Sequence, residues 1–138
     1  MFLHTRLKVR DLERSIAFYC THFGFQCRDR KTSPRGSQLA FLHMKGTPTE
    51  LELAYLPWDA DFKLDEDIFH LAFEVHGMRQ VVEKMRQAGV KITDEPMQTS
   101  SGSWMAFIED PDGYEIELLD YSEVTAEKKA AAEAEGQV

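Results

Sequence analysis

The spacing of hydrophobic residues predicts two helices, each of which follows a short strand. Gly24 and Gly89 mark the C-terminal ends of these helices, and Asp11 is the predicted N-cap of the first. Apolar side chains recur along one face with helical period, namely Leu12, Ile16, Tyr19 and Phe23 in the first helix and Met78, Val81, Val82 and Met85 in the second. Strand-like runs occupy 4–9, 37–44 and 50–56 in the first half, and 70–75, 103–110 and 114–121 in the second.

The two halves of the chain repeat this pattern in register. HTRLKV (4–9) and HLAFEV (70–75) both begin with histidine and precede a helix, and a glutamate recurs in the last strand of each half, at Glu52 and Glu117. Each half therefore reads β-α-β-β-β, which is typical of two copies of one small module. We expect an α+β fold with one domain over 1–121, made of module one at about 1–57 and module two at about 67–121.

Strand parity indicates which way the repeated residues point. His4 shares its strand face with Arg6 and Lys8, and Glu52 lies opposite its apolar neighbours; His70 and Glu117 follow the same rule. The apolar faces would be covered by the helices, which leaves His4, Glu52, His70 and Glu117 on the other face. Two imidazoles and two carboxylates suit a borderline divalent metal such as Ni, Co, Zn or Fe. A structural histidine and a solvated glutamate are the alternative for each residue alone, so the metal prediction depends on their coincidence in both halves.

Composition narrows the classes of function. The chain has 138 residues, 43% of them hydrophobic and 29% charged, as in ordinary soluble proteins. A net charge of −8 argues against a nucleic-acid partner, and the absence of a long apolar run argues against a membrane protein. Two cysteines, Cys20 and Cys27, are too few for a disulfide scaffold, so we expect a cytoplasmic protein. The segment 122–138 is rich in Ala, Glu and Lys, offers no apolar stripe for docking, and is expected to be a flexible charged tail.

These residues resemble a known family. LHTRLKVRDLERSIAFY (3–19), ELELAY (50–55), HLAFEV (70–75) and AFIEDPDGYEIELL (106–119) are similar to the vicinal oxygen chelate superfamily and, within it, to short bacterial glyoxalase I (lactoylglutathione lyase). The resemblance implies paired βαβββ modules that form an open, curved mixed sheet around a metal, with the helices on the convex face. DLERSIAFY is shared across the superfamily, whereas EDPDGYEIEL together with both His and both Glu residues is more specific to glyoxalase I.

The resemblance also implies a reaction and a site. His4, Glu52, His70 and Glu117 would bind one divalent metal, Ni(II) or Co(II) in preference to Zn(II), in a homodimer whose active sites form between subunits. The reaction would isomerise the hemithioacetal of methylglyoxal and glutathione to S-lactoylglutathione through an enediolate. Glu117 would be the catalytic base, with Glu52 as its counterpart.

Two positions depart from the family pattern. Family members have an arginine four residues after the first histidine and an asparagine four residues after the first glutamate, both of which contact glutathione; here these are Lys8 and Leu56. Lysine keeps the positive charge for a substrate carboxylate but lacks the planar fork of arginine, and leucine forms no hydrogen bond through its side chain.

Three other functions remain open. The first is another isomerase on the same scaffold, such as a methylmalonyl-CoA-type epimerase, although such epimerases usually have glutamine at the position of Glu52. The second is a non-haem iron dioxygenase, which needs two histidines and a single carboxylate. The third is a non-catalytic protein that sequesters a ligand, a class that generally lacks the full ligand set.

Overall fold

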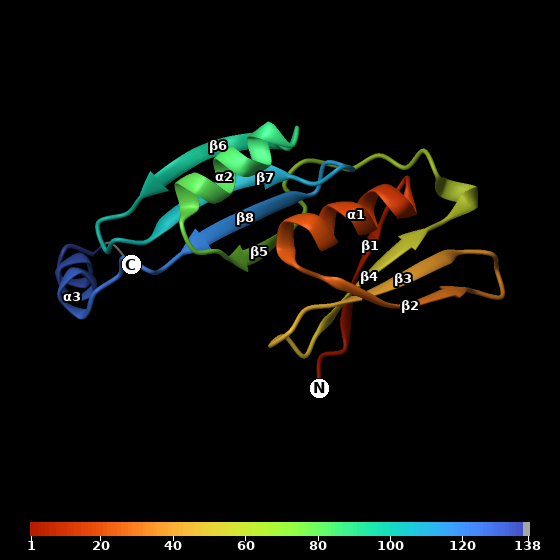
Figure 1. Ribbon diagram of the computed structural model, residues 1–138, viewed down its shortest axis with the longest axis horizontal. Helices are drawn as coiled ribbons and strands as arrows, with labels where there is room; N and C mark the ends of the chain where they lie inside the picture. The colour runs from red at the N-terminus through yellow and green to blue at the C-terminus, as the bar shows by residue number, and fades with distance from the viewer. Residues whose placement is uncertain (137–138) are drawn as a thin grey trace. The chain divides into compact units, whose positions relative to one another are not determined.

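The computed structural model describes residues 1–136 and divides the chain into two compact units, Met1–Leu64 and Asp65–Val138. The boundary falls inside the stretch that separates the two predicted modules. Each unit contains a four-stranded sheet with a helix against it (Figure 1).

The first unit is one βαβββ module. Its elements, in chain order, are β1 (His4–Lys8), α1 (Leu12–Phe23), β2 (Gln26–Thr32), β3 (Gln38–His43) and β4 (Glu50–Tyr55), followed by the 3-10 helix η1 (Pro57–Asp59). The strands lie in the order β1-β4-β3-β2; β1 pairs with β4 in parallel and the other neighbours are antiparallel. Helix α1 packs on one face of this sheet, against β2, β3 and β4.

The second unit repeats this topology. It contains β5 (His70–Glu74), α2 (Met78–Gln87), β6 (Lys91–Gln98), β7 (Trp104–Glu109), β8 (Glu115–Asp120) and then α3 (Ala126–Ala134). The strand order is β5-β8-β7-β6, with β5 and β8 parallel and α2 against β6, β7 and β8. The predicted α+β class and the two βαβββ modules are therefore confirmed.

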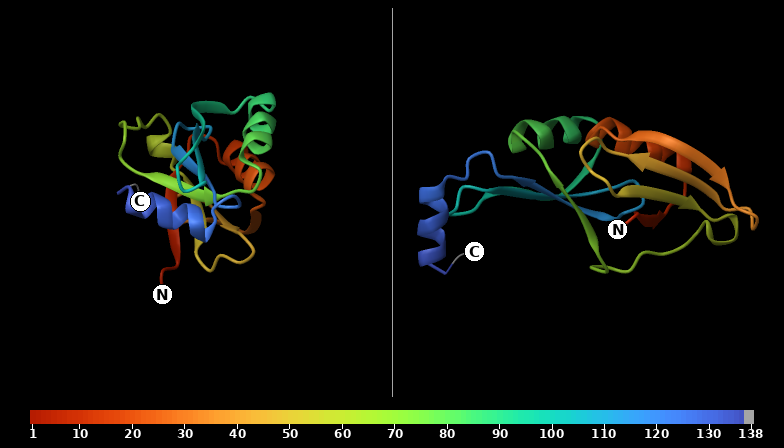
Figure 2. Two further views of the ribbon diagram at one scale, coloured as in Figure 1. Left: turned by 90° about the vertical axis from the view of Figure 1, so that its left-hand side faces the viewer. Right: turned by 90° about the horizontal axis from the view of Figure 1, so that it is seen from below.

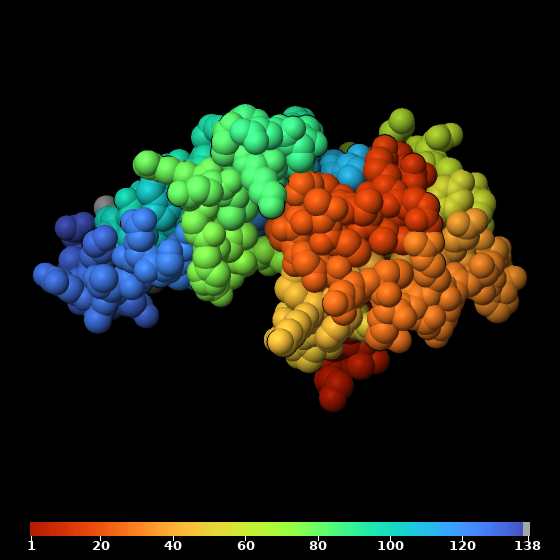
Figure 3. Space-filling model, viewed as in Figure 1, coloured from red at the N-terminus to blue at the C-terminus, as the bar shows by residue number. Residues whose placement is uncertain are grey.

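Helix ends and cores follow the sequence pattern closely. Asp11 accepts a hydrogen bond from the Arg14 backbone N–H at 3.0 Å, and Gly24 ends α1 in the left-handed region at φ 71°. Leu7, Leu42 and Leu53, from β1, β3 and β4, are fully buried. In the space-filling view the N-terminal segment, in red, stands out from the first unit, in keeping with the exposed side chains of its first three residues (Figure 3).

The strands β2 and β6 were not located from the sequence. Their sequences, QCRDRKT and KITDEPMQ, are mostly polar and exposed. A register shift also interrupts the pairing of each strand with its neighbour, so polar and apolar residues do not alternate regularly along it. Both lie at the edge of their sheet, where little apolar surface is covered.

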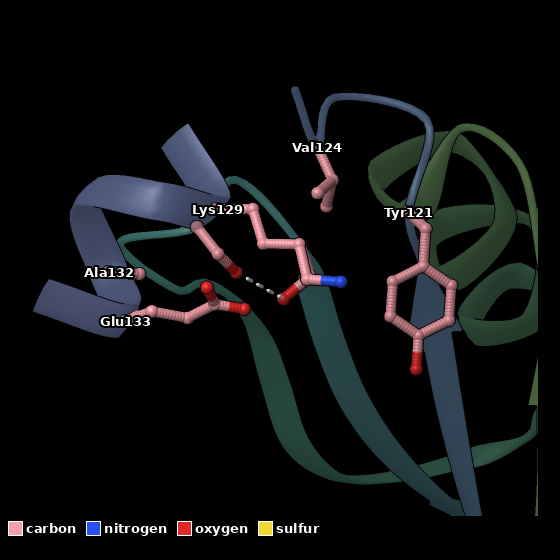
Figure 4. A pocket seen from close by; sticks show the side chains of 7 residues that line it. Tyr121, Val124, Lys129, Ala132 and Glu133 are labelled. Carbon is pink, nitrogen blue, oxygen red and sulfur yellow. Dashed lines mark hydrogen bonds between the residues drawn. The ribbon is translucent and has the colours of Figure 1, made fainter. Parts of the chain in front are cut away.

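The charged tail contains the helix α3, which its Ala, Glu and Lys content allows; its flexibility stays a prediction. Thr125 caps α3 by accepting a hydrogen bond from the Lys128 backbone N–H at 3.1 Å. Figure 2 shows α3 across the end of the second unit's sheet. In α3 the buried side chain is that of Ala132, which is 2% exposed and lies beside a cavity of about 210 Å³ between α3 and the end of the sheet (Figure 4).

Within residues 1–136, no helix is long and apolar enough to cross a membrane.

A buried carboxylate at the end of β8 ties that strand to α2. Gly77, at φ 79°, precedes α2 and has no side chain with which to cap it. Asp120, 2% exposed, replaces that cap: one of its oxygens accepts the N–H groups of Gly77 and Met78 at 2.9 and 3.1 Å, and the other accepts the N–H and hydroxyl of Ser122. Burial acts to raise the pKa of Asp120, but these hydrogen bonds outweigh burial and lower it.

We expect Asp120→Asn to lower the free energy of unfolding by about 2–3 kcal/mol, because an amide nitrogen would face N–H donors. Since the folded-state pKa is lowered, the stabilisation from Asp120 is complete above the unfolded-state value of about 3.9 and is lost as pH falls through the folded-state value. Chemical denaturation at pH 7 and at decreasing pH measures both effects. Asp65→Asn, at an exposed position, is the control; equal stability of the two variants at pH 7 would contradict the capping role.

Candidate metal centre

In the first unit His4 and Glu52 meet on the sheet face opposite α1. β1 and β4 pair so that Arg6, and not His4, stands beside Glu52, which places His4 diagonally from the carboxylate. The His4 Nε2 atom lies 3.2 Å from Glu52 Oε2. The Glu52 side chain is 3% exposed and that of His4 is 44% exposed, so the imidazole is the accessible half of the pair.

The second unit builds the same pair from the same register. Ala72 stands beside Glu117 in the parallel pairing of β5 and β8, and His70 again lies on the diagonal. The His70 Nε2 atom is 2.9 Å from Glu117 Oε2, and the Glu117 side chain is 19% exposed. The structure therefore brings the four predicted residues together in two pairs, one in each unit.

A phenylalanine flanks each pair and was not singled out from the sequence. Phe41 stands beside Glu52 and contacts His4 edge-to-face, with ring centroids 6.0 Å apart; Phe107 stands beside Glu117 and contacts His70 at 5.9 Å. Each ring limits the positions open to its histidine. The signal was present in the sequence, because both residues follow an alanine at the same position of the repeat, in AFLH and AFIE.

The sheet faces that carry the two His–Glu pairs differ in their charged neighbours. In the first unit, Arg6 donates two hydrogen bonds to Glu52, at 3.0 and 3.1 Å, and this contact raises the pKa of Arg6. Arg28 holds Glu50 in the same way, at 2.5 and 2.9 Å, and lowers the pKa of that carboxyl. In the second unit Glu115 lies 3.7 Å from His70 Nδ1, so that histidine has a carboxylate near each of its ring nitrogens.

Lys8, the predicted substrate-binding residue, is engaged within its own unit. Its ammonium group forms an ion pair with Asp59 of η1 and lies 4.8 Å from the centre of the Phe62 ring. Arg10 covers the same ring at 4.3 Å and donates to the Phe62 carbonyl. Lys8 would therefore have to exchange Asp59 for a substrate carboxylate.

The donor set fits a divalent metal, although neither unit completes it. Each pair offers one imidazole nitrogen and one carboxylate oxygen about 3 Å apart, the separation of neighbouring ligands on one ion. Among the described residues, no group of three or more His, Cys, Asp or Glu side chains could hold a metal.

Comparisons with known proteins agree with this repeated arrangement. The family model of the Glyoxalase/Bleomycin resistance protein/Dioxygenase superfamily matches residues 2–118. A lactoylglutathione lyase of Escherichia coli O157:H7 is 39% identical over 124 residues, which cover 86% of this chain and 90% of that protein. The chain belongs to the Glyoxalase/Bleomycin resistance protein/Dioxygenase superfamily.

Solved structures point to the glyoxalase I branch of that superfamily. The trypanothione-dependent glyoxalase I of Leishmania major aligns with a TM-score of 0.76 and 33% identity, over 100% of this chain and 99% of that chain. Glyoxalase I of Zea mays aligns with a TM-score of 0.75 and 30% identity, over 86% of this chain and 43% of the maize chain. The resemblance to glyoxalase I inferred from the sequence motifs is thus confirmed.

Proposed function

We propose that this protein is a metal-dependent lactoylglutathione lyase. It would convert the hemithioacetal formed from methylglyoxal and a thiol, with glutathione as the first candidate, to the 2-hydroxyacyl thioester S-lactoylglutathione, and so detoxify methylglyoxal. The observation that carries the proposal is the pair of register-matched His–Glu contacts, His4–Glu52 and His70–Glu117, in a chain similar to lactoylglutathione lyases along most of its length. The free cysteines Cys20 and Cys27 are compatible with a cytoplasmic enzyme.

His4, Glu52, His70 and Glu117 would hold the metal. Nitrogen and oxygen donors in equal number favour a borderline ion, and we propose Ni(II) or Co(II) first and Zn(II) second. When bound, the ion supplies positive charge that stabilises negative charge on two adjacent substrate oxygens.

The carboxylates would move the proton. Glu117 would take the proton from the hemithioacetal carbon that bears the hydroxyl and sulfur, giving an enediolate, and would return it to the neighbouring carbon, so that no net proton is lost. Glu117 suits this role better than Glu52, because its side chain is more exposed and Arg6 holds both oxygens of Glu52. Glu52 is proposed as its counterpart on the other side of the substrate.

The other functions on this scaffold have less support. A dioxygenase site needs two histidines and one carboxylate, whereas the repeat presents two carboxylates. Lys8 and Leu56, however, favour a test of thiols beyond glutathione, as does the similarity to a trypanothione-dependent relative. A stoichiometric metal content would separate the enzymatic proposals from a ligand-sequestering protein.

The first test is hemithioacetal isomerase activity of metal-stripped protein that has been reloaded separately with Ni(II) and Zn(II). We expect activity with methylglyoxal and glutathione in the Ni(II) protein and little in the Zn(II) protein, measured by the absorbance of the thioester. Trypanothione and coenzyme A replace glutathione in parallel assays. One tightly bound metal per site without activity on any of these thiols would contradict the proposed reaction and turn attention to epimerisation.

A second test concerns the base. Glu117→Gln removes the proton acceptor but keeps the shape of the side chain, so we expect kcat to fall by about 10²-fold or more while the protein stays folded. Glu109→Gln, on the same sheet, is the matched control and should retain activity. Activity of Glu117→Gln within a few-fold of wild type would exclude this role.

We further propose a homodimer in which each site takes one His–Glu pair from each subunit. The maize glyoxalase I supports it, because its single chain is about twice as long as the matched part of this chain and so has the length of two such subunits.

Subunit mixing tests this arrangement. His4→Ala and His70→Ala should each be inactive alone, because every site then lacks one imidazole. After unfolding and refolding together in equal amounts, half of the dimers are mixed and each has one intact site, so about a quarter of the wild-type activity should return. Sites built within one chain would give no recovery.

A further inference from the structure

Both oxygens of Glu52 are occupied by partners from its own unit. Arg6 Nε donates to Oε2 at 3.1 Å and Arg6 Nη2 donates to Oε1 at 3.0 Å, so that the guanidinium meets the carboxylate as a fork. His4 Nε2 approaches the same Oε2 atom at 3.2 Å. The Glu52 side chain is 3% exposed and that of Arg6 is 51% exposed, so the carboxylate is shielded from water while the guanidinium stays partly solvated.

In the part of the chain that the structure describes, the second unit has no counterpart of this contact between an arginine and the glutamate. Arg6 and Ala72 occupy equivalent places, each directly beside the glutamate of its unit in the parallel strand pairing. An alanine has no donor, and the ion pair that the described residues form with Glu117 comes from His70. The two carboxylates of an otherwise repeated site are therefore inequivalent.

A guanidinium in this position opposes a metal ion in two ways. It uses lone pairs of the carboxylate that a ligand would offer to the ion, and its positive charge would repel a divalent cation bound to the same carboxylate. Without a metal, the same contact is favourable, because a buried carboxylate without a cationic partner is costly.

We propose that Arg6 is a positioning residue that acts as the internal counter-ion of Glu52: it holds this carboxylate in the metal-free protein and competes with the metal for it. Arg6 thereby lowers the affinity of the site for a divalent ion below the value that the His4 and Glu52 donors would otherwise give. This inference rests on the proposed metal-binding role of His4 and Glu52.

Arg6→Met tests the proposal, since methionine keeps much of the length of the stem but has neither the charge nor the donors. We measure dissociation constants for Ni(II) and Zn(II) by chelator competition, and thermal unfolding with and without metal. The variant should bind both ions about 10-fold tighter or more, because a charge repulsion is removed. Its metal-free form should unfold at a lower temperature than wild type, and the rise on metal binding should be larger.

Two further variants sharpen the result. Arg30→Met removes the same kind of fork from the exposed Glu13 of α1 without touching His4 or Glu52, so its metal dissociation constants should stay close to those of wild type. Arg6→Gln keeps a hydrogen-bond donor for Glu52 but no charge, and should also bind metal more tightly even if the methionine variant folds poorly.

The outcomes separate this inference from the proposed function. Metal affinity that is unchanged or weaker in both Arg6 variants, or that rises equally in Arg30→Met, would overturn the competition by Arg6 while leaving the metal site intact. A wild-type protein that binds neither ion, or whose affinity does not fall in Glu52→Gln, would overturn the metal-binding role of Glu52 itself.

Discussion

In each module the first strand pairs in parallel with the last, and this pairing sets the position of every candidate ligand. Parallel strands in one sheet require a crossover connection, which here consists of a helix and two further strands. The register places His4 diagonally from Glu52 and His70 diagonally from Glu117, so that an imidazole nitrogen lies about 3 Å from a carboxylate oxygen in both units. A shift of one residue would turn either member of a pair toward the helix-covered face.

The two modules share this topology, but the glutamates of β4 and those of β8 have different charged neighbours. Arginines neutralise both glutamates of β4, through the contacts of Arg6 and Arg28, whereas the corresponding glutamates of β8 surround His70. A duplicated scaffold thus gives two carboxylates of the same type in different surroundings. Such inequivalence is useful in proton-transfer chemistry, where one group must hold its place while another gains and loses a proton.

Several parts of the fold could be predicted because their physical cause is local. Asp11 and Gly24 cap α1 as their residue types indicate, and the buried stripe of α2 follows helical spacing. The edge strands β2 and β6 could not be located, since their stability comes from hydrogen bonds to one neighbouring strand and leaves almost no hydrophobic pattern. The burial of Ala132 in α3 could not be predicted for a related reason, since alanine is too common in exposed helices to mark a buried face.

The sequence by itself determined the repeat, the identity of the four candidate ligands and the face on which they lie, because strand parity and helical period are properties of the chain alone. Tertiary structure decided how those residues meet. Only the pairing of β1 with β4 shows that Arg6 reaches Glu52, and only the position of η1 shows that Lys8 is held by Asp59. These contacts join residues 46 and 51 positions apart, and such distances are closed by the folded sheet and not by any local pattern in the chain.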